Sequence, residues 1–489
     1  MRPGITDGGV TMTETPKRLI LLASASSYRS GDFVEAAKRL GIEVALGMDV
    51  PAPLAHTYSC SLPLDYLDLE RSTRAIAKYA GQNPVLVILS ADDSATVLAA
   101  EASQRLGLRH NSPEAAEAAQ DKYVMRQLFA KAGVPSPNFK LYSLSDDPEA
   151  IVEEIEEGER PERSADEVRR AVKGRGSGAS TALFDFDPHT AQVSAQGACD
   201  QKVSFPCVLK PRRLSGSRGV IRADSPMDFI VAHKRLQPIL EKTGADDFLV
   251  EDFIPGFEIA LEGMLDNGAL KVLALFDKPD PLDGPFFEET IYVTPSRLPA
   301  GTQQAIFDCA AKAAAALGLR DGPVHAELRV NERGPSTSLT RAYATGAGRA
   351  GPWMVELAGR SIGGLCSRTL RFGTEMSLEE LILRQAFGME IETTQREGRA
   401  GGVMMIPIPK AGIFVGCSGL DEAKAAPGIE SIEITAKLNY PIYPLPEGDS
   451  YLGFIFARGT APEDVEAALR EAHRRLRFEI QPEIQVMGA

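Results

Sequence analysis

Two stretches in the second half of the chain alternate apolar and charged residues, and each carries a carboxylate. Residues 323–330 (PVHAELRV) and 353–360 (WMVELAGR) both fit β-strands, whose side chains point alternately to opposite faces. Glu327 then lies on the polar face of the first strand, while Glu356 and Arg360 share a face of the second. If the strands pair, both carboxylates meet on one face of a largely apolar sheet.

Two carboxylates held close together raise each other's pKa unless a cation lies between them. A hard divalent cation such as Mg²⁺ takes oxygen ligands and commonly completes its coordination with water and substrate phosphates. The pattern therefore predicts a metal-assisted phosphate site carried by Glu327 and Glu356. An exposed hairpin with one polar face fits the same pattern equally well.

The composition is typical of a globular protein, with 44% hydrophobic and 25% charged residues. A chain of 489 residues exceeds a single core, so two to four domains are expected. The net charge of -14 argues against a general binder of nucleic acid or of membrane surfaces. No apolar run of about 18 residues appears, so no membrane span is expected.

The six cysteines are scattered and form no Cys-x-x-Cys pair. This spacing argues against both a disulfide framework and a zinc site, and it suits a reducing, cytoplasmic compartment. Residues 1–15 are polar and lack the apolar core of a signal peptide, so we expect a disordered tail there.

Short apolar strands alternate with helices over residues 18–106, which predicts a parallel α/β sheet. Ligands bind such sheets at the carboxyl ends of strands, where Asp92 and Asp93 follow the strand predicted at 84–89. A helix N-cap is the favoured role for these two residues. Because no Gly-x-Gly-x-x-Gly follows the first strand, a Rossmann dehydrogenase is a poor interpretation.

A strand predicted at 205–211 brings Lys210 to the start of a loop that is rich in small and basic residues, 212–221. Small residues let backbone N–H groups approach an anion closely, so the loop fits a flap that covers phosphates. It lacks the terminal Lys-Ser/Thr of a P-loop. Two further stretches, about 158–204 and 336–351, have no clear periodicity and are predicted to be flexible insertions.

The remaining segments predict a mixed sheet and a last, smaller unit. Residues 258–265 and 270–276 flank an Asp-Asn-Gly turn and are predicted to form a hairpin, and residues 300–317 form an amphipathic helix. From about residue 401, three strands and the helix 462–475 predict a small α+β domain that packs or acts as a lid.

Taken in order, these segments resemble the ATP-grasp superfamily of carboxylate–amine ligases, and most nearly its branch of L-amino acid (dipeptide) ligases and carnosine synthase. Each matching motif is common alone, but five of them occur in the family's order: Asp121-Lys122 with 132–137, 208–211 with 215–219, 251–258, 325–327 and 356–364. The resemblance implies an α/β and α+β multidomain protein. A Rossmann-like domain (16–112) would precede the ATP-grasp fold (113–372), and a lid-like α+β domain (373–489) would follow it.

The resemblance also implies the ligands and their residues. The expected ATP-binding residues are Lys122, Lys210, Ser215, Gly216, Ser217, Gly219, Glu251, Phe253 and Glu258. Among these, the lysines would contact the phosphates and the adenine edge, 215–219 would cover the triphosphate, Glu251 and Phe253 would hold adenine, and Glu258 would accept hydrogen bonds from ribose. Glu327 and Glu356 would carry Mg²⁺ or Mn²⁺. Arg360 would steady the substrate carboxylate, and Glu289 would lie near the metal and the amino substrate.

The implied reaction joins a small-molecule carboxylate and an amine, expected to be amino acids, with release of ADP and phosphate through an acyl phosphate. Many members of the family are dimers, which leaves a homodimer open. Ala358 stands where many members carry a metal-binding Asn, so one metal position is in doubt. Two alternatives stay open: activation of another carboxylate such as bicarbonate, and an ATP-binding protein whose insertions prevent turnover. His325 is interpreted as a hydrogen-bonded structural residue rather than a group that acts near the amine.

Overall fold

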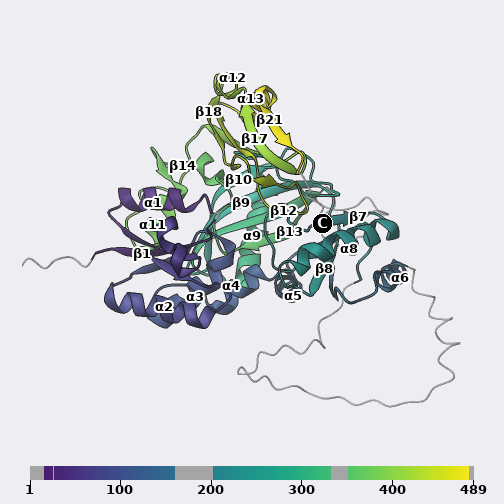
Figure 1. Ribbon diagram of the computed structural model, residues 1–489, viewed down its shortest axis with the longest axis horizontal. Helices are drawn as coiled ribbons and strands as arrows, with labels where there is room; N and C mark the ends of the chain where they lie inside the picture. The colour runs from purple at the N-terminus through teal and green to yellow at the C-terminus, as the bar shows by residue number, and fades with distance from the viewer. Residues whose placement is uncertain (1–15, 26, 160–201, 332–350, 484–489) are drawn as a thin grey trace, which may run out of the picture.

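The structure is a computed structural model that describes residues 16–25, 27–159, 202–331 and 351–483. The predicted tail and almost all of the two predicted insertions lie outside these ranges. None of the described helices is long and apolar enough to cross a membrane. Figure 1 shows the N-terminal domain on one side of a large central sheet and a smaller sheet near α8 on the other.

The N-terminal domain contains the predicted parallel α/β sheet, with strand order β3-β2-β1-β4. Leu19 to Ala23 of β1 are fully buried, because a central parallel strand is covered on both faces. The elements are β1 (Arg18–Ala23), α1 (Ser30–Arg39), β2 (Glu43–Asp49), β3 (Leu62–Leu64), α2 (Leu69–Gln82), β4 (Val87–Ser90) and α3 (Thr96–Leu106).

A second sheet supports the loop predicted to cover phosphates. It is antiparallel, with order β5-β8-β6-β7, and it packs against α6 and α8. The loop between β6 and β7, here called the flap (residues 212–220), begins directly after Pro211, the residue that follows Lys210 in β6. The elements are α4 (Pro113–Gln120), α5 (Lys122–Ala132), β5 (Phe139–Ser143), α6 (Pro148–Glu159), β6 (Cys207–Pro211), β7 (Ile221–Ala223), α8 (Pro226–Glu241) and β8 (Asp247–Asp252).

The central sheet has eight strands in the order β13-β12-β9-β10-β11-β16-β20-β18. The two strands that carry Glu327 and Glu356 pair as the sequence predicts, and these two residues lie directly opposite each other. The strands are β9 (Phe257–Asp266), β10 (Ala269–Asp277), β11 (Ile291–Thr294), β12 (Gly322–Asn331), β13 (Gly351–Ala358), β16 (Ala400–Ile406), β18 (Ile429–Ile434) and β20 (Gly453–Gly459). Helix α9 (Ala300–Leu317) packs against the part formed by β9, β12 and β13, at the bounds predicted from its periodicity.

The central sheet crosses the domain boundary predicted at 372, because β16 pairs with β11 and carries β20 and β18 with it. Helix α13 (Pro462–Arg475) covers this part of the sheet through Val465, Leu469 and Ala472. A small sheet of β17 (Gly412–Ser418), β19 (Pro441–Ile442) and β21 (Arg477–Gln481) lies beside it, and α11 (Leu378–Ala386) packs near α1. The C-terminal region is thus joined to residues 113–372 by strand pairing within one continuous sheet.

The β11–β16 junction gives a first prediction. A Cβ atom on Gly402 of β16 would lie 2.6 Å from Val465 of α13 and 2.9 Å from the carbonyl of Tyr292. Gly402→Val should therefore lower the free energy of unfolding by about 1–3 kcal/mol, because the sheet and α13 must move apart. Thermal denaturation measures this effect. Gly416→Val in β17 is the control, because no atom lies within 4 Å of a Cβ added there. Equal denaturation midpoints for the two variants would contradict the close packing of β16 against α13.

Candidate active site

A cavity of about 650 Å³ opens where the N-terminal domain, the flap and the central sheet meet. Its walls also include residues of the C-terminal region between 435 and 451. Twelve of the predicted site residues line it: Lys122, Lys210, Ser215, Gly216, Ser217, Glu251, Phe253, Glu258, Glu289, Glu327, Glu356 and Arg360. Gly219 is not among the lining residues, and its backbone N–H donates to the carbonyl of Pro446.

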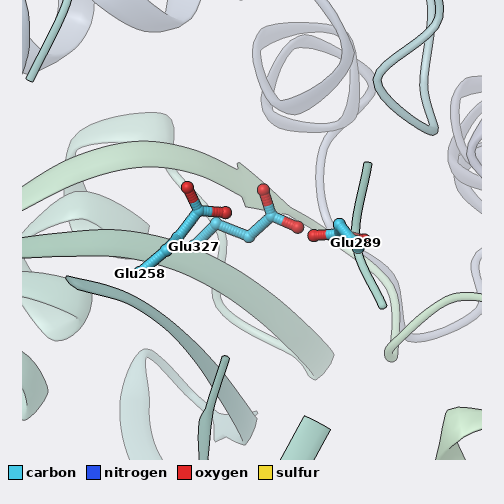
Figure 2. A group of neighbouring side chains, drawn as sticks. All are labelled: Glu258, Glu289 and Glu327. Atoms are coloured by element: carbon cyan, nitrogen blue, oxygen red, sulfur yellow. The ribbon is translucent and has the colours of Figure 1, made fainter. Parts of the chain in front are cut away.

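Three carboxylates converge at the centre of this cavity. One oxygen from each of Glu258, Glu289 and Glu327 lies within 4.8 Å of the others. Figure 2 shows Glu258 and Glu327 reaching from neighbouring strands, with Glu289 facing them from a separate segment. These three groups form the acid cluster. An all-oxygen donor set of this size fits a hard divalent cation such as Mg²⁺.

Glu356 does not belong to this cluster of three. Although it lies opposite Glu327 in the strand register, its carboxylate contacts the ammonium of Lys122 at 3.5 Å. Glu258 is predicted to hold ribose, yet it contacts the buried Arg329 at 3.0 Å and lies inside the acid cluster.

Lys278, which the sequence analysis does not single out, places its ammonium among the three carboxylates. Its Nζ lies 2.8 Å from Glu258 and 3.4 Å from Glu327, and it donates a hydrogen bond to Glu289. The lysine side chain is buried. Burial lowers the pKa of Lys278, but the three carboxylates more than offset this and hold the pKa well above its usual range.

Glu289 and Glu327 differ in how readily they ionise. Burial, together with the charges of Glu327 and Glu258, raises the pKa of Glu289 to about 7. Burial also opposes ionisation of Glu327, but Lys278 and His325 outweigh it and hold the pKa of Glu327 well below its usual range. Of these two residues, Glu289 therefore gains a proton first as the pH falls.

The buried pair of His325 and Glu262 contacts the carboxylate of Glu327 and orients it. His325 Nδ1 lies 3.2 Å from Glu262, and its Nε2 lies 3.6 Å from Glu327. Glu262 is fully buried and accepts the backbone N–H of Ile362 at 3.0 Å. These contacts agree with the structural role predicted for His325.

Two lysines line the cavity together with residues of the flap. Lys122, at the start of α5, donates to the carbonyl of Leu214 at 2.7 Å and is buried. Lys210 pairs with Glu251 at 2.7 Å, and Glu251 also accepts a hydrogen bond from Nη2 of the buried Arg126 at 3.1 Å. The carboxylate of Glu251, predicted to hold adenine, is thus occupied by two cations.

The N-terminal domain holds Arg360 in place. Asp93 pairs with Arg360 at 2.6 Å. Arg29 donates to the neighbouring Ser361 and to the carbonyl of Ala91, so it ties the same segment to β4. The prediction that Asp92 and Asp93 cap a helix is met in position only: Asp92 is the N-cap residue of a short 3-10 helix (Asp93–Ala95), but its side chain makes no capping hydrogen bond. It accepts the backbone N–H of Ser24 and the hydroxyl of Ser27 instead.

The signals for these additional residues were weak in the sequence. Lys278 ends an apolar strand, as Lys210 does, but no small-residue loop follows it. Asp93 lies at the carboxyl end of a parallel strand, which is where α/β sheets place ligands. Arg29 follows a turn of small residues after β1 and carries no comparable signal.

Three family models match the chain. Residues 34–110 match the ATP-grasp N-terminal domain, residues 203–369 the ATP-grasp domain, and residues 404–481 the L-amino acid ligase C-terminal domain 2.

Among curated proteins, alanine–anticapsin ligase from Bacillus subtilis is 25% identical over 335 residues, which is 65% of this chain and 60% of that protein. The chain thus spans less than two thirds of the length of this relative. The structure of an L-amino acid ligase from Bacillus licheniformis matches with a TM-score of 0.69 and 22% identity, over 96% of this chain and all of that one. A Hydrogenobacter thermophilus biotin carboxylase domain in complex with MgADP, ADP and bicarbonate matches with a TM-score of 0.58 and 16% identity, over 94% and 90% of the two chains.

The contacts of Lys278 give a second prediction. Lys278→Met leaves the acid cluster without the cation that touches all three carboxylates, so the free energy of unfolding should fall by about 3 kcal/mol at pH 8. The loss should be smaller at pH 6, because Glu289, with its raised pKa, takes up a proton there and reduces the repulsion. Added Mg²⁺ should restore the stability at pH 8.

Thermal denaturation at both pH values, with and without Mg²⁺, tests this prediction. Lys271→Met, at an exposed position on β10, the strand that directly precedes Lys278, is the matched control. A Lys278→Met variant as stable as this control at pH 8 would contradict the role of the ammonium.

Proposed function

We propose that this chain, which carries the N-terminal and central domains of ATP-grasp enzymes, is an ATP-dependent ligase that joins the carboxylate of an amino acid to an amine. The matches to the ATP-grasp domains confirm the fold that the motifs imply. The observation that carries the proposal is the acid cluster in the same cavity as Lys122, Lys210 and the flap. The L-amino acid ligase C-terminal domain supports amino acids as the substrate class.

The proposed chemistry first activates the carboxylate. A carboxylate does not react with an amine at neutral pH, because an oxide ion is a poor leaving group. Transfer of the γ-phosphoryl group of ATP to a carboxylate oxygen forms an acyl phosphate and releases ADP. The amine then attacks the acyl carbon, phosphate leaves with the original carboxylate oxygen, and the amine loses a proton as the amide forms.

The proposed phosphoryl transfer needs charge neutralisation and positioning rather than a protein nucleophile. Lys122 and Lys210, which line the cavity beside the flap, would neutralise the phosphates. Glu251 is proposed to orient Lys210 rather than adenine, since its carboxylate already pairs with that lysine. Phe253, which lines the cavity beside Phe287, keeps its proposed place against the adenine ring.

The residues that would hold Mg²⁺ are Glu289 and Glu327 of the acid cluster together with Glu356, which lies opposite Glu327 in the strand register but outside the cluster. Glu258 would contribute charge from the side of Arg329. A bound divalent ion supplies charge stabilisation to the transferring phosphoryl group. The acid cluster offers oxygens from two strands and a loop, so the Ala358 position is not needed to build an oxygen-only site. Arg360, fixed by Asp93, is proposed to steady the carboxylate while it is phosphorylated.

The test is release of ADP and phosphate with Mg²⁺ and a panel of amino acids, offered singly and in pairs. Glu327→Gln should abolish the signal, and Glu392→Gln at an exposed position should leave it unchanged. ADP formed only with particular pairs supports the ligase. ADP formed with bicarbonate alone would replace the proposed substrate class, and bound ATP without any ADP would show a binding protein without turnover.

The Asp93–Arg360 pair gives a further prediction. Asp93→Asn removes the charge that orients Arg360, so kcat should fall by about 10- to 100-fold while ATP affinity stays unchanged, because misplacement of a group that positions the reactants costs rate at this scale. Steady-state kinetics together with ATP titration measure both quantities. Asp308→Asn, on the exposed side of α9, is the control, and a kcat equal to that control would contradict the positioning role.

A further inference from the structure

A loop of the C-terminal region reaches across to the flap and to helix α8. Residues 443–450, here called the latch loop, follow β19, and Asp449 and Ser450 line the same cavity as Ser215 to Ser217 of the flap. The family motifs assign no role to the latch loop. Three separate contacts connect it to the β6–β7–α8 unit.

The first contact fixes the end of the flap. The N–H of Gly219 donates to the carbonyl of Pro446 at 2.9 Å. Gly219 has a φ of 73°, and a Cβ atom there would lie 2.7 Å from Pro211 and 3.1 Å from Leu236 of α8. The backbone at Gly219 is therefore confined between β6, α8 and the latch loop, which explains why a glycine is required although it does not line the cavity.

The second contact is an ion pair one residue away from Leu236. Arg235 of α8 donates to both oxygens of Glu447, at 2.7 and 3.0 Å, and its guanidinium lies 4.6 Å from the centre of the Phe286 ring. The two side chains are 41% and 39% exposed, so their contribution to global stability is small. A bidentate pair whose guanidinium also packs on an aromatic ring nevertheless fixes the orientation of the latch loop relative to α8. The third contact, Arg218 to Asp449 at 3.8 Å, is longer.

We propose that Arg235 and Glu447 are a positioning pair through which the C-terminal region sets the flap over the phosphates of a bound nucleoside triphosphate. The inference rests on the proposed function only in taking a nucleotide as the ligand of the flap. It gives the C-terminal region a part in nucleotide binding, in addition to its place in the central sheet. Glu447 acts through Arg235, Leu236 and Gly219 and does not itself touch the ligand.

Charge reversal tests the pair. Arg235→Glu and Glu447→Arg each place like charges together, and the double variant restores opposite charges in exchanged positions. Each single variant should weaken binding of MgATP by about fivefold, the factor that corresponds to a well-placed surface pair. Each should also speed trypsin cleavage after Arg213 and Arg218 in the absence of nucleotide, because the flap is released. Isothermal titration and timed proteolysis measure the two effects, and no amino-acid substrate is needed.

Restoration of both properties in the double variant supports the proposal. Single variants that bind MgATP and resist trypsin as the wild type does would overturn it, and so would a double variant as impaired as the singles. Glu447→Gln, a milder change, guards against misfolding and should give a smaller effect in the same direction. The matched control is reversal of the exposed pair Arg74–Glu70 on α2. Cleavage without nucleotide reports on the latch loop even if the protein does not bind ATP, so the two proposals fail separately.

Discussion

The crowding of three carboxylates around one point in a cavity is the constraint on which the site depends. Glu258, Glu289 and Glu327 converge within 4.8 Å in a cavity, where their mutual repulsion and their desolvation both oppose ionisation. Lys278 offsets this repulsion, because its ammonium contacts all three carboxylates. The same negative centre that requires this lysine is the feature that fits a divalent cation and, through it, the phosphates of ATP.

The remainder of the fold keeps this centre assembled and enclosed. Strands β9 and β12 set Glu258 and Glu327 side by side, and the buried His325–Glu262 pair supports Glu327 from the far side. The N-terminal domain contacts the segment of Arg360 and Ser361 through Asp93 and Arg29, and residues of the C-terminal region line another wall of the cavity. Acyl phosphates hydrolyse readily, so a site built from three regions around one cavity suits a reaction that must exclude water.

The sequence predicted features that depend on local pattern. Period-two alternation indicated the strands of Glu327 and Glu356, and helical periodicity placed α9 at its observed bounds. The family motifs indicated the fold, which the comparisons confirm, and nearly all of the predicted site residues line one cavity. The roles assigned to those residues stay predictions.

Features that depend on long-range register were not predictable in this way. Asp93 meets Arg360 across 267 residues, and Arg29 meets Ser361 across 332 residues, so no spacing in the chain indicates either contact. The pairing of β11 with β16 is of the same kind, and it carries the central sheet past the predicted boundary at 372. Lys278 lies among the carboxylates only because the β9–β10 hairpin brings it beside Glu258. The local sequence pattern at Lys278 indicates the end of a strand and nothing more.

The most direct test of the proposed chemistry follows the oxygen atoms of the carboxylate substrate. An amino acid labelled with ¹⁸O in its carboxyl group is converted with MgATP and an amine, and the released phosphate is analysed by mass spectrometry. An acyl phosphate intermediate predicts one ¹⁸O in each phosphate, together with ADP. Amide formed with unlabelled phosphate, or with AMP and pyrophosphate as products, would contradict the account.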